Sequence, residues 1–211
     1  SAPGPVTIKS RAVDNTGNVQ NPLAEITVTV RTPIRVPSDQ PTIQSAINVA
    51  TFGDTVLVAP GTYPENINFG GKAITVTSES GPQVTIIDGG NADSVVIFLS
   101  GEGRDSVLNG FTLQNGRGVQ GPNQGGGIIV GARSSPAITN NVIRNNRACD
   151  GGGIGITGGS PLIQRNTITG NDTRTGCGGE TTGGGISIRG AGSAEIIDNV
   201  ISDNMNPTGD G

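Results

Sequence analysis

The sequence predicts an all-β solenoid with a parallel β-helix wall, and three observations support this prediction. Glycine and proline are abundant, with 36 Gly and 13 Pro among 211 residues, which disfavours long helices. Only 2% of the residues are aromatic although 32% are hydrophobic, so the core must be aliphatic. One pattern of short apolar segments also repeats along the chain, as it does in solenoid proteins.

Each repeat contains three short apolar segments, and in the full repeats these follow a glycine triplet. Residues 125–150, 151–171 and 183–204 share this order, and a weaker copy at 94–116 has Phe111 where the others have Asn. Segments of two to five residues separated by Gly, Asn or Pro are too short for useful helices. Because every unit keeps the same order, we expect a coil with three strands per turn, each beside its counterpart one turn away.

Asparagines recur at fixed distances within these turns. Steps of 30, 25 and 33 residues separate the equivalent positions Ser106, Pro136, Pro161 and Ala194, and the variation falls in one loop. Asn tolerates the left-handed backbone conformation of a tight bend, and its amide can bond along the stack. Stacking of the turns therefore predicts two asparagine columns: Asn141, Asn166 and Asn199 in one, and Asn146, Asn171 and Asn204 in the other.

A short amphipathic helix is expected just before the first turn. Apolar residues at 43, 46, 47 and 50 have helical spacing, and Ser38 or Asp39 is the expected cap. We expect this helix to cover the N-terminal opening of the solenoid, which would otherwise present unpaired backbone groups. Residues 55–58 would then form the first strand.

Residues 1–32 form a separate segment that is predicted to be a β-hairpin. Residues 6–14 and 24–30 alternate between apolar and polar types, with a turn at 15–18. The phrase from Arg11 to Asn18 looks like the last two strands of an immunoglobulin-like or fibronectin-like domain. A lone hairpin is marginally stable. Either the remaining strands preceded it, or it docks on something else.

Residues 36–211 resemble the right-handed parallel β-helix superfamily of pectate lyases, polygalacturonases and pectin esterases. The segments that carry the resemblance are 41–47 (PTIQSAI), 53–66 (GDTVLVAPGTYPEN) and the repeated GGGI with Asn-rich bends. The resemblance implies that chemistry would lie on the outer face of the first strand of each turn and in the loops beside it. In those relatives, Asp clusters hold calcium beside an Arg base, or paired carboxylates act as acid and base.

The outer face of the first strands can be read from the alternation of the sequence. If Ile128, Ile154 and Ile186 point inward, the outward positions are Ile129, Gly155 and Ser187, with Val96 and Phe98 in the preceding turn. We expect no charged residue there. No catalytic residue of the family can therefore be matched in this chain, and the reading leans away from an enzyme.

Acidic residues gather in the variable loop after the third strand. Those that could bind Ca²⁺ together are Asp150, Asp172 and Glu180, with Asp203 and Asp210 in equivalent loops. The alternative is turn formation and solubility, which we favour because Asp-Gly and Asn-Asp pairs are ordinary in bends. Apart from this Ca²⁺, no cofactor is expected.

The arginines and the cysteines of the repeats lead to different expectations. The arginines could form a track that binds an anionic polysaccharide; they are Arg144, Arg147, Arg165, Arg174 and Arg189. Scattered surface charges are favoured instead, because Arg144 and Arg165 occupy unlike positions in their repeats.

Cys149 and Cys177 lie in the same loop one turn apart. Adjacent turns are about 4.8 Å apart, within reach of a disulfide. Their Gly, Asp and Thr neighbours disfavour burial, so a bond is preferred over buried thiols, which predicts a secreted protein.

Composition excludes several other classes. A net charge of −4 disfavours nucleic-acid binding, and the absence of His removes His-based triads and most zinc sites. No apolar stretch reaches the roughly 20 residues that a membrane-spanning helix requires.

Three functions remain as hypotheses. The first is a secreted structural or interaction module of a cell-surface or filamentous protein. The second is a fragment of a pectin lyase-like lyase or hydrolase, and the third is a carbohydrate-binding module without turnover. The outward residues argue against the second, and the scarcity of aromatic residues for sugar stacking argues against the third.

The end of the repeats suggests a mode of assembly. After Asn204 no capping helix or polar strand is recognisable, so we expect the final turn to be open. An open turn and an incomplete hairpin on one chain suggest head-to-tail association. Truncation of a longer chain is the competing explanation.

Overall fold

The computed structural model describes residues 5–10, 13–19, 24–29, 31–118, 125–173 and 182–206. The chain divides into two compact units, Ser1–Pro33 and Ile34–Gly211. Among the described residues, no helix is long and apolar enough to cross a membrane.

The first unit contains an antiparallel pair of strands. Strand β1 (Pro5–Ser10) pairs with β2 (Ala24–Thr29), and Val13 bridges Val19 nearer the tip. At the tip, Asp14 accepts hydrogen bonds from the side chains and backbone amides of Thr16 and Asn18. These bonds hold the pKa of the Asp14 carboxyl well below its ordinary value.

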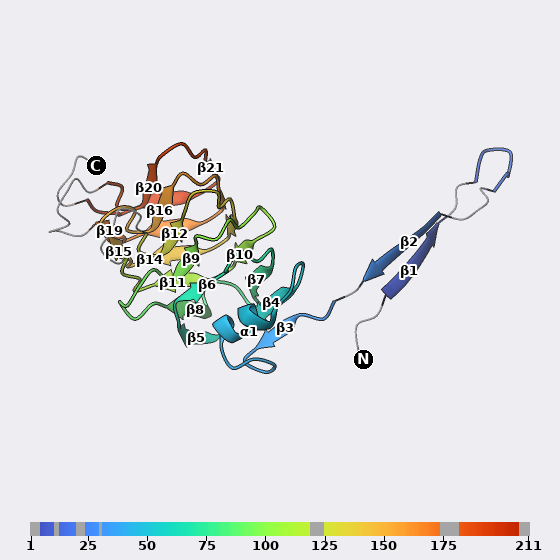
Figure 1. Ribbon diagram of the computed structural model, residues 1–211, viewed down its shortest axis with the longest axis horizontal. Helices are drawn as coiled ribbons and strands as arrows, with labels where there is room; N and C mark the ends of the chain where they lie inside the picture. Colours follow the sequence, from blue (N-terminus) through green and yellow to red (C-terminus); the bar gives the residue numbers. More distant parts are fainter. Residues whose placement is uncertain are drawn as a thin grey trace. The chain divides into compact units, whose positions relative to one another are not determined.

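The second unit is a parallel β-helix, as the repeats predict. Its turns stack in chain order from α1 to β20 and β21, which Figure 1 shows as a passage from cyan to red. The strands that follow the glycine triplets form the first sheet: β6 (Ile67–Asn68), β9 (Val96–Phe98), β12 (Ile128–Val130), β16 (Ile154–Thr157) and β20 (Ile186–Arg189).

Two further parallel sheets complete the wall. The second sheet is formed by β3 (Ile34–Val36), β4 (Thr55–Val58), β7 (Thr75–Ser78), β10 (Val107–Asn109), β13 (Ala137–Thr139), β17 (Leu162–Gln164) and β21 (Glu195–Ile197). The third sheet is formed by β5 (Gly61–Pro64), β8 (Thr85–Asp88), β11 (Thr112–Gln114), β14 (Val142–Arg144), β18 (Thr167–Thr169) and β22 (Val200–Ser202). Strand β3 pairs with β4, so the first strand is β3 and not residues 55–58 as expected.

The predicted register of the wall is confirmed. Ile128 pairs with Ile154 and Ile154 with Ile186 in the first sheet, and Ile143, Ile168 and Ile201 align in the third. Side chains of the inner turns, such as Ile128, Ile154 and Ile168, are fully buried and form one continuous aliphatic core. The same positions become exposed in the last turn, where Ile201 is 49% exposed.

The exposed apolar residues of the last turn form a set. Within this chain they are Ile188, Ile196, Ile197, Val200, Ile201 and Met205, each at least 40% exposed. The strands that carry most of them, β20, β21 and β22, pair with only one neighbour each among the described residues. In the part of the chain that the structure describes, β20, β21 and β22 are therefore edge strands of the three sheets.

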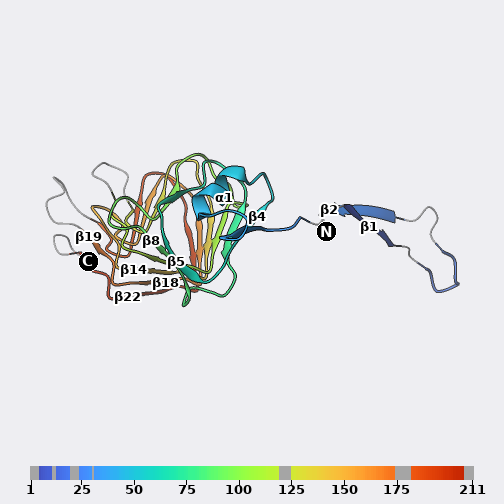
Figure 2. The same ribbon diagram turned by 90° about the horizontal axis from the view of Figure 1, so that it is seen from below.

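Helix α1 (Ile43–Val49) packs against β3, β4 and β6, and Figure 2 shows it beside β4 at the start of the stack. Its cap is Thr42, not Ser38 or Asp39 as expected, because the Thr42 side chain accepts a bond from Ser45 N–H while Ser45 Oγ lies 3.2 Å from Thr42 N. Ile43, Ala46 and Ile47 point into the core. The helix therefore covers this end of the core as predicted.

Charged residues from the first turn hold both ends of α1. The two carboxylate oxygens of Glu65 accept bonds of 2.9 Å from Ile43 N and Gln44 N. At the other end, Lys72 Nζ donates to the carbonyls of Ile47, Asn48 and Ala50 at 2.7–2.9 Å. An anion at the N-terminus and a cation at the C-terminus of a helix both complement its dipole.

Candidate functional site

Polar side chains gather where the loops after the third sheet return to the first sheet. Two short strands, β15 (Arg147–Ala148) and β19 (Asp172–Thr173), form a further parallel pair in this region. Bridges also join Arg117 to Arg147, Asp150 to Thr182 and Asp172 to Met205. The loops are therefore stacked like the rest of the wall, and side chains from successive turns lie side by side.

The asparagine columns form the corners on either side of the third sheet. Asn166 Oδ1 accepts bonds from Asn141 N and Nδ2, and Asn166 Nδ2 donates to Asn199 Oδ1. Asn146, Asn171 and Asn204 are linked in the same way. Phe111 occupies the corresponding corner one turn earlier and donates its N–H to Asn141 Oδ1.

The bend itself is made by the residue before each column asparagine. Asn140, Arg165 and Asp198 have φ of 55°, and so does Asp203 in the second corner. The expectation that the stacked asparagines adopt the left-handed conformation is therefore wrong. Their amides are instead turned toward the neighbouring turns, where they satisfy backbone groups such as Leu108 O and Ile138 O.

The glycine triplets pack backbone against backbone. Gly153 N donates to Gly184 O, and a Cβ on Gly153 would lie 2.5 Å from Gly185 O, which is too close. A Cβ on Gly151 would likewise collide with Ile154 O. The first glycine of this triplet is therefore folded back over the strand that follows it.

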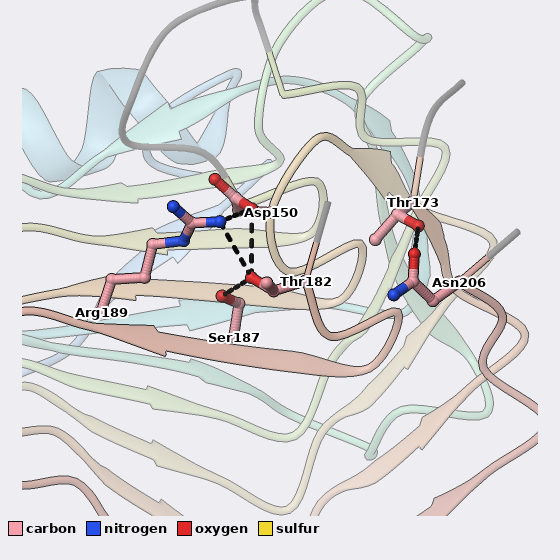
Figure 3. A network of polar contacts seen from close by, with 6 residues as sticks. All are labelled: Asp150, Thr173, Thr182, Ser187, Arg189 and Asn206. Carbon is pink, nitrogen blue, oxygen red and sulfur yellow. Dashed lines mark hydrogen bonds and ion pairs between the residues drawn. The ribbon is translucent and has the colours of Figure 1, made fainter. Parts of the chain in front are cut away.

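A four-residue polar network lies on the outer face of the first sheet at its C-terminal end (Figure 3). Arg189 Nη2 contacts Asp150 Oδ1 at 2.8 Å, and Thr182 Oγ1 donates to the same oxygen at 3.1 Å. Ser187 Oγ lies 2.8 Å from Thr182 Oγ1. Ser187 and Arg189 alternate along β20 with inward Ile186 and Ile188, so both face outward.

Two expectations about this outer face are wrong. The outward residue of β9 is Ile97, which pairs with Ile129, whereas Val96 and Phe98 are fully buried in the core. The face also carries a charged residue, Arg189. Arg189 pairs with Thr157 and is the next outward position after Ser187, so the alternation along β20 predicts it there, but only the first outward position of each strand was considered.

The outer face of the first sheet becomes progressively covered. Asn68 is exposed and Ile97 is half-buried, whereas Ile129 is only 7% exposed, Gly155 is buried and Ser187 is 5% exposed. The returning loops carry Gly151 and Asp150 over this face. The network of Asp150, Thr182, Ser187 and Arg189 then ties the loop before β20 to the sheet.

A second cluster surrounds a groove on the loop side of the third sheet. The groove has a volume of about 470 Å³, and we call it the arginine groove; its lining residues include Asn91, Arg117, Asn145, Arg147, Asp172 and Met205. Arg147 Nη2 contacts Asp172 Oδ2 at 2.9 Å, with the Asp172 side chain only 16% exposed. The other oxygen, Asp172 Oδ1, is buried and has no hydrogen-bond partner among the described residues.

Among the described residues, the candidate calcium ligands are not brought together with a third acid. Asp150 pairs with Arg189, and Asp172 pairs with Arg147. No group of three or more His, Cys, Asp or Glu side chains suited to a metal occurs in the part of the chain that the structure describes. Glu180 and Asp210 lie outside the described residues.

The remaining arginines occupy different sites. Arg144 Nη2 donates to Gln114 Oε1 on the third sheet, whereas Arg165 lies at the corner after β17. Arg174 lies outside the described residues. Arg117 and Arg147, however, are aligned, and sequence reasoning missed this. The signal was present, because Arg117, Arg147, Asp172 and Met205 each lie six residues after a corner position, namely Phe111, Asn141, Asn166 or Asn199.

Cys149 is buried, with 8% of its surface exposed. The expectation that its small polar neighbours would keep it from being buried is wrong, because the loop packs against the first sheet at Asp150. Cys177 lies outside the described residues, so the bond between the two cysteines stays a prediction.

Glu102 is a fully buried carboxylate outside both clusters. Its oxygens accept bonds from Gly71 N at 2.9 Å, Ser100 N at 3.0 Å and Ser134 Oγ at 2.8 Å. These partners come from three successive turns. Glu102 therefore fastens the corner between the first and second sheets.

Comparisons with protein-family models, curated proteins and solved structures found no match to this chain.

Proposed function

We propose that this chain is a structural and interaction module of a secreted protein, whose β-helix acts by presenting a surface and not by catalysis. The supporting observation is the covered outer face of the first sheet. Ile129, Gly155 and Ser187 leave no open row of ionisable side chains there, and Arg189 is engaged by Asp150 at 2.8 Å. A catalytic site on this face would need free acid, base or metal-binding groups that a substrate can reach.

A likeness to the pectin lyase-like superfamily is part of this proposal. It is supported by the three parallel sheets, the N-terminal covering helix and the asparagine corners, together with the segments at 41–47 and 53–66. Secretion is supported by the predicted bond between Cys149 and Cys177.

The second candidate is a lyase or hydrolase of the same superfamily. The observation that favours it is the position of Arg189 beside Asp150 on the outer face, where the resemblance puts a carboxylate and an arginine base. The two candidates are separated by incubating the chain with polygalacturonate, with and without Ca²⁺, and measuring new reducing ends and unsaturated uronate. The proposed module releases neither. Product that is lost in Arg189→Ala but not in the matched variant Arg133→Ala would establish the enzyme instead.

Self-association end to end is the finer form of the proposal. The apolar side chains that this association would cover lie on β20–β22 and beside them, such as Val200 at 58% and Met205 at 62% exposed. Helix α1 covers the other end of the core, so the turn of β20–β22 in one copy does not stack directly on that end of another, and the proposal assigns the contact to the hairpin of β1 and β2. Sedimentation should show concentration-dependent polymers that vanish when residues 1–33 are deleted. A monomer in both forms would contradict this.

A further inference from the structure

We propose that the arginine groove binds a compact oxyanion, a phosphate or a carboxylate, between Arg117 and Arg147. This inference rests on the proposed role as an interaction module. It is carried by the alignment of two arginines from adjacent turns, both of which line one groove of about 470 Å³.

The backbone fixes the two arginines beside each other. Arg147 N donates to Gly116 O and Gly118 N donates to Arg147 O, both at 2.9 Å, so residues 117 and 147 are direct neighbours across the wall. Like charges directly opposite each other in a sheet repel and destabilise the pair. Asp172 offsets part of this repulsion through its contact with Arg147, and an anion beside Arg117 would relieve the rest.

The charges of the groove do not balance. Asp172 neutralises Arg147 through the contact at 2.9 Å. The side chain of Arg117 is exposed and makes no hydrogen bond or ion pair with the described residues. Among the lining residues this leaves one uncompensated positive charge, although the whole chain has a net charge of −4.

The rest of the lining supplies neutral donors. The side-chain amides of Asn91 and Asn145 line the groove and bond to none of the described residues. A guanidinium presents its N–H groups in a fork that matches the two oxygens of a carboxylate or phosphate, and charge-assisted bonds of this kind are the strong ones. The residues from Arg117 through Arg147 and Asp172 to Met205 span three steps of the wall, about 14 Å.

The test is a titration of the ¹⁵N-labelled full chain with sodium phosphate and, separately, sodium acetate at constant ionic strength. Wild type should show saturable shifts confined to the groove residues, with a dissociation constant on the order of 1 mM. Arg117→Gln should weaken binding roughly tenfold, the loss of one charge-assisted contact. Asp172→Asn should strengthen it several-fold, because the competing carboxylate is removed.

The matched control is Arg133→Gln. Arg133 is exposed at the corner between β12 and β13, and its side chain makes no hydrogen bond or ion pair with the described residues. Its replacement by Gln changes the net charge by the same amount as Arg117→Gln. Its affinity should equal that of the wild type. Preference for phosphate or for acetate identifies which oxyanion the groove takes. Equal losses in Arg117→Gln and Arg133→Gln, or shifts spread over all arginines, would overturn the proposal. Cleavage of polygalacturonate would instead overturn the proposed function and leave this result unaffected.

Discussion

Replacing Asn166 by Ala tests whether the asparagine columns hold the turns together. Asn166 is 1% exposed. Its Oδ1 accepts two bonds, from Asn141 N at 2.9 Å and Asn141 Nδ2 at 3.1 Å. Its Nδ2, which carries two hydrogens, lies 2.9–3.1 Å from three acceptors, Ile138 O, Gln164 O and Asn199 Oδ1. The substitution removes all of these contacts from a site that water does not reach.

The expected loss of stability follows from these contacts. A hydrogen bond contributes about 1 kcal/mol net, and a buried donor or acceptor left unpaired costs about 1–3 kcal/mol. Asn141 N–H and Ile138 C=O would lose this partner, so the free energy of unfolding should fall by about 3–5 kcal/mol. Urea denaturation followed by circular dichroism measures this change.

The matched control is Gln164→Ala on the neighbouring strand β17. The Gln164 side chain is half-buried and makes no hydrogen bond with the described residues, so its loss should change the unfolding free energy by no more than about 0.5 kcal/mol. If Asn166→Ala and Gln164→Ala differ by less than about 1 kcal/mol, the columns are not a principal source of stability, and the reasoning is refuted.

Three further predictions concern the helix, an aspartate and the cysteines. Lys72→Met removes three bonds to the carbonyls of Ile47, Asn48 and Ala50. It should lower the free energy of unfolding by about 2 kcal/mol and speed proteolysis within α1. Unchanged proteolysis would show that Lys72 does not hold the end of the helix. Burial opposes ionisation of Asp88, but bonds from Gln114, Gly90 N–H and Asn115 outweigh it and lower its pKa below 3.8. The stabilisation from Asp88 is therefore present above its unfolded-state pKa and is lost as pH falls through the lower folded-state pKa. Asp88→Asn should reduce the fall of the unfolding free energy at acid pH. An unchanged fall would refute this role of Asp88. Thiol titration of the denatured, unreduced chain should find no free thiol if Cys149 and Cys177 are joined, and reduction should cost roughly 3–4 kcal/mol for this span; two reactive thiols would exclude the bond.

Much of the fold could be predicted because every turn of a solenoid repeats the same sequence pattern. The positions Pro136, Pro161 and Ala194 align the turns, and the observed pairs Ala137–Leu162 and Leu162–Glu195 have the same spacings. Ile128 and Val130 alternate with Ile129 along β12, and this alternation predicts which side chains face inward. These features depend on local pattern and on the regular spacing of parallel strands.

The candidate site could be predicted only in part, because it depends on how loops of unequal length return to the wall. Asp150 and Arg189 are 39 residues apart, and no periodicity relates them. The offset of six residues that aligns Arg117 with Arg147 was present in the sequence, because Phe111 already matched the asparagine corners. The pattern does not show, however, that the loops after these corners stay paired, as the bridge between Arg117 and Arg147 does. The cap of α1 was misplaced because Ser38 and Asp39 are equally suitable by type, whereas the turn geometry selects Thr42.

One incubation tests most directly whether the chain presents a surface and does not cleave a polymer. Polygalacturonate would be kept with the wild-type chain, Arg189→Ala and Arg133→Ala, with Ca²⁺ and with a chelator, and its length distribution followed by size-exclusion chromatography. The covered outer face and the engaged pair of Asp150 and Arg189 predict an unchanged distribution in every sample. Shortening by the wild type and Arg133→Ala, but not by Arg189→Ala, would contradict this.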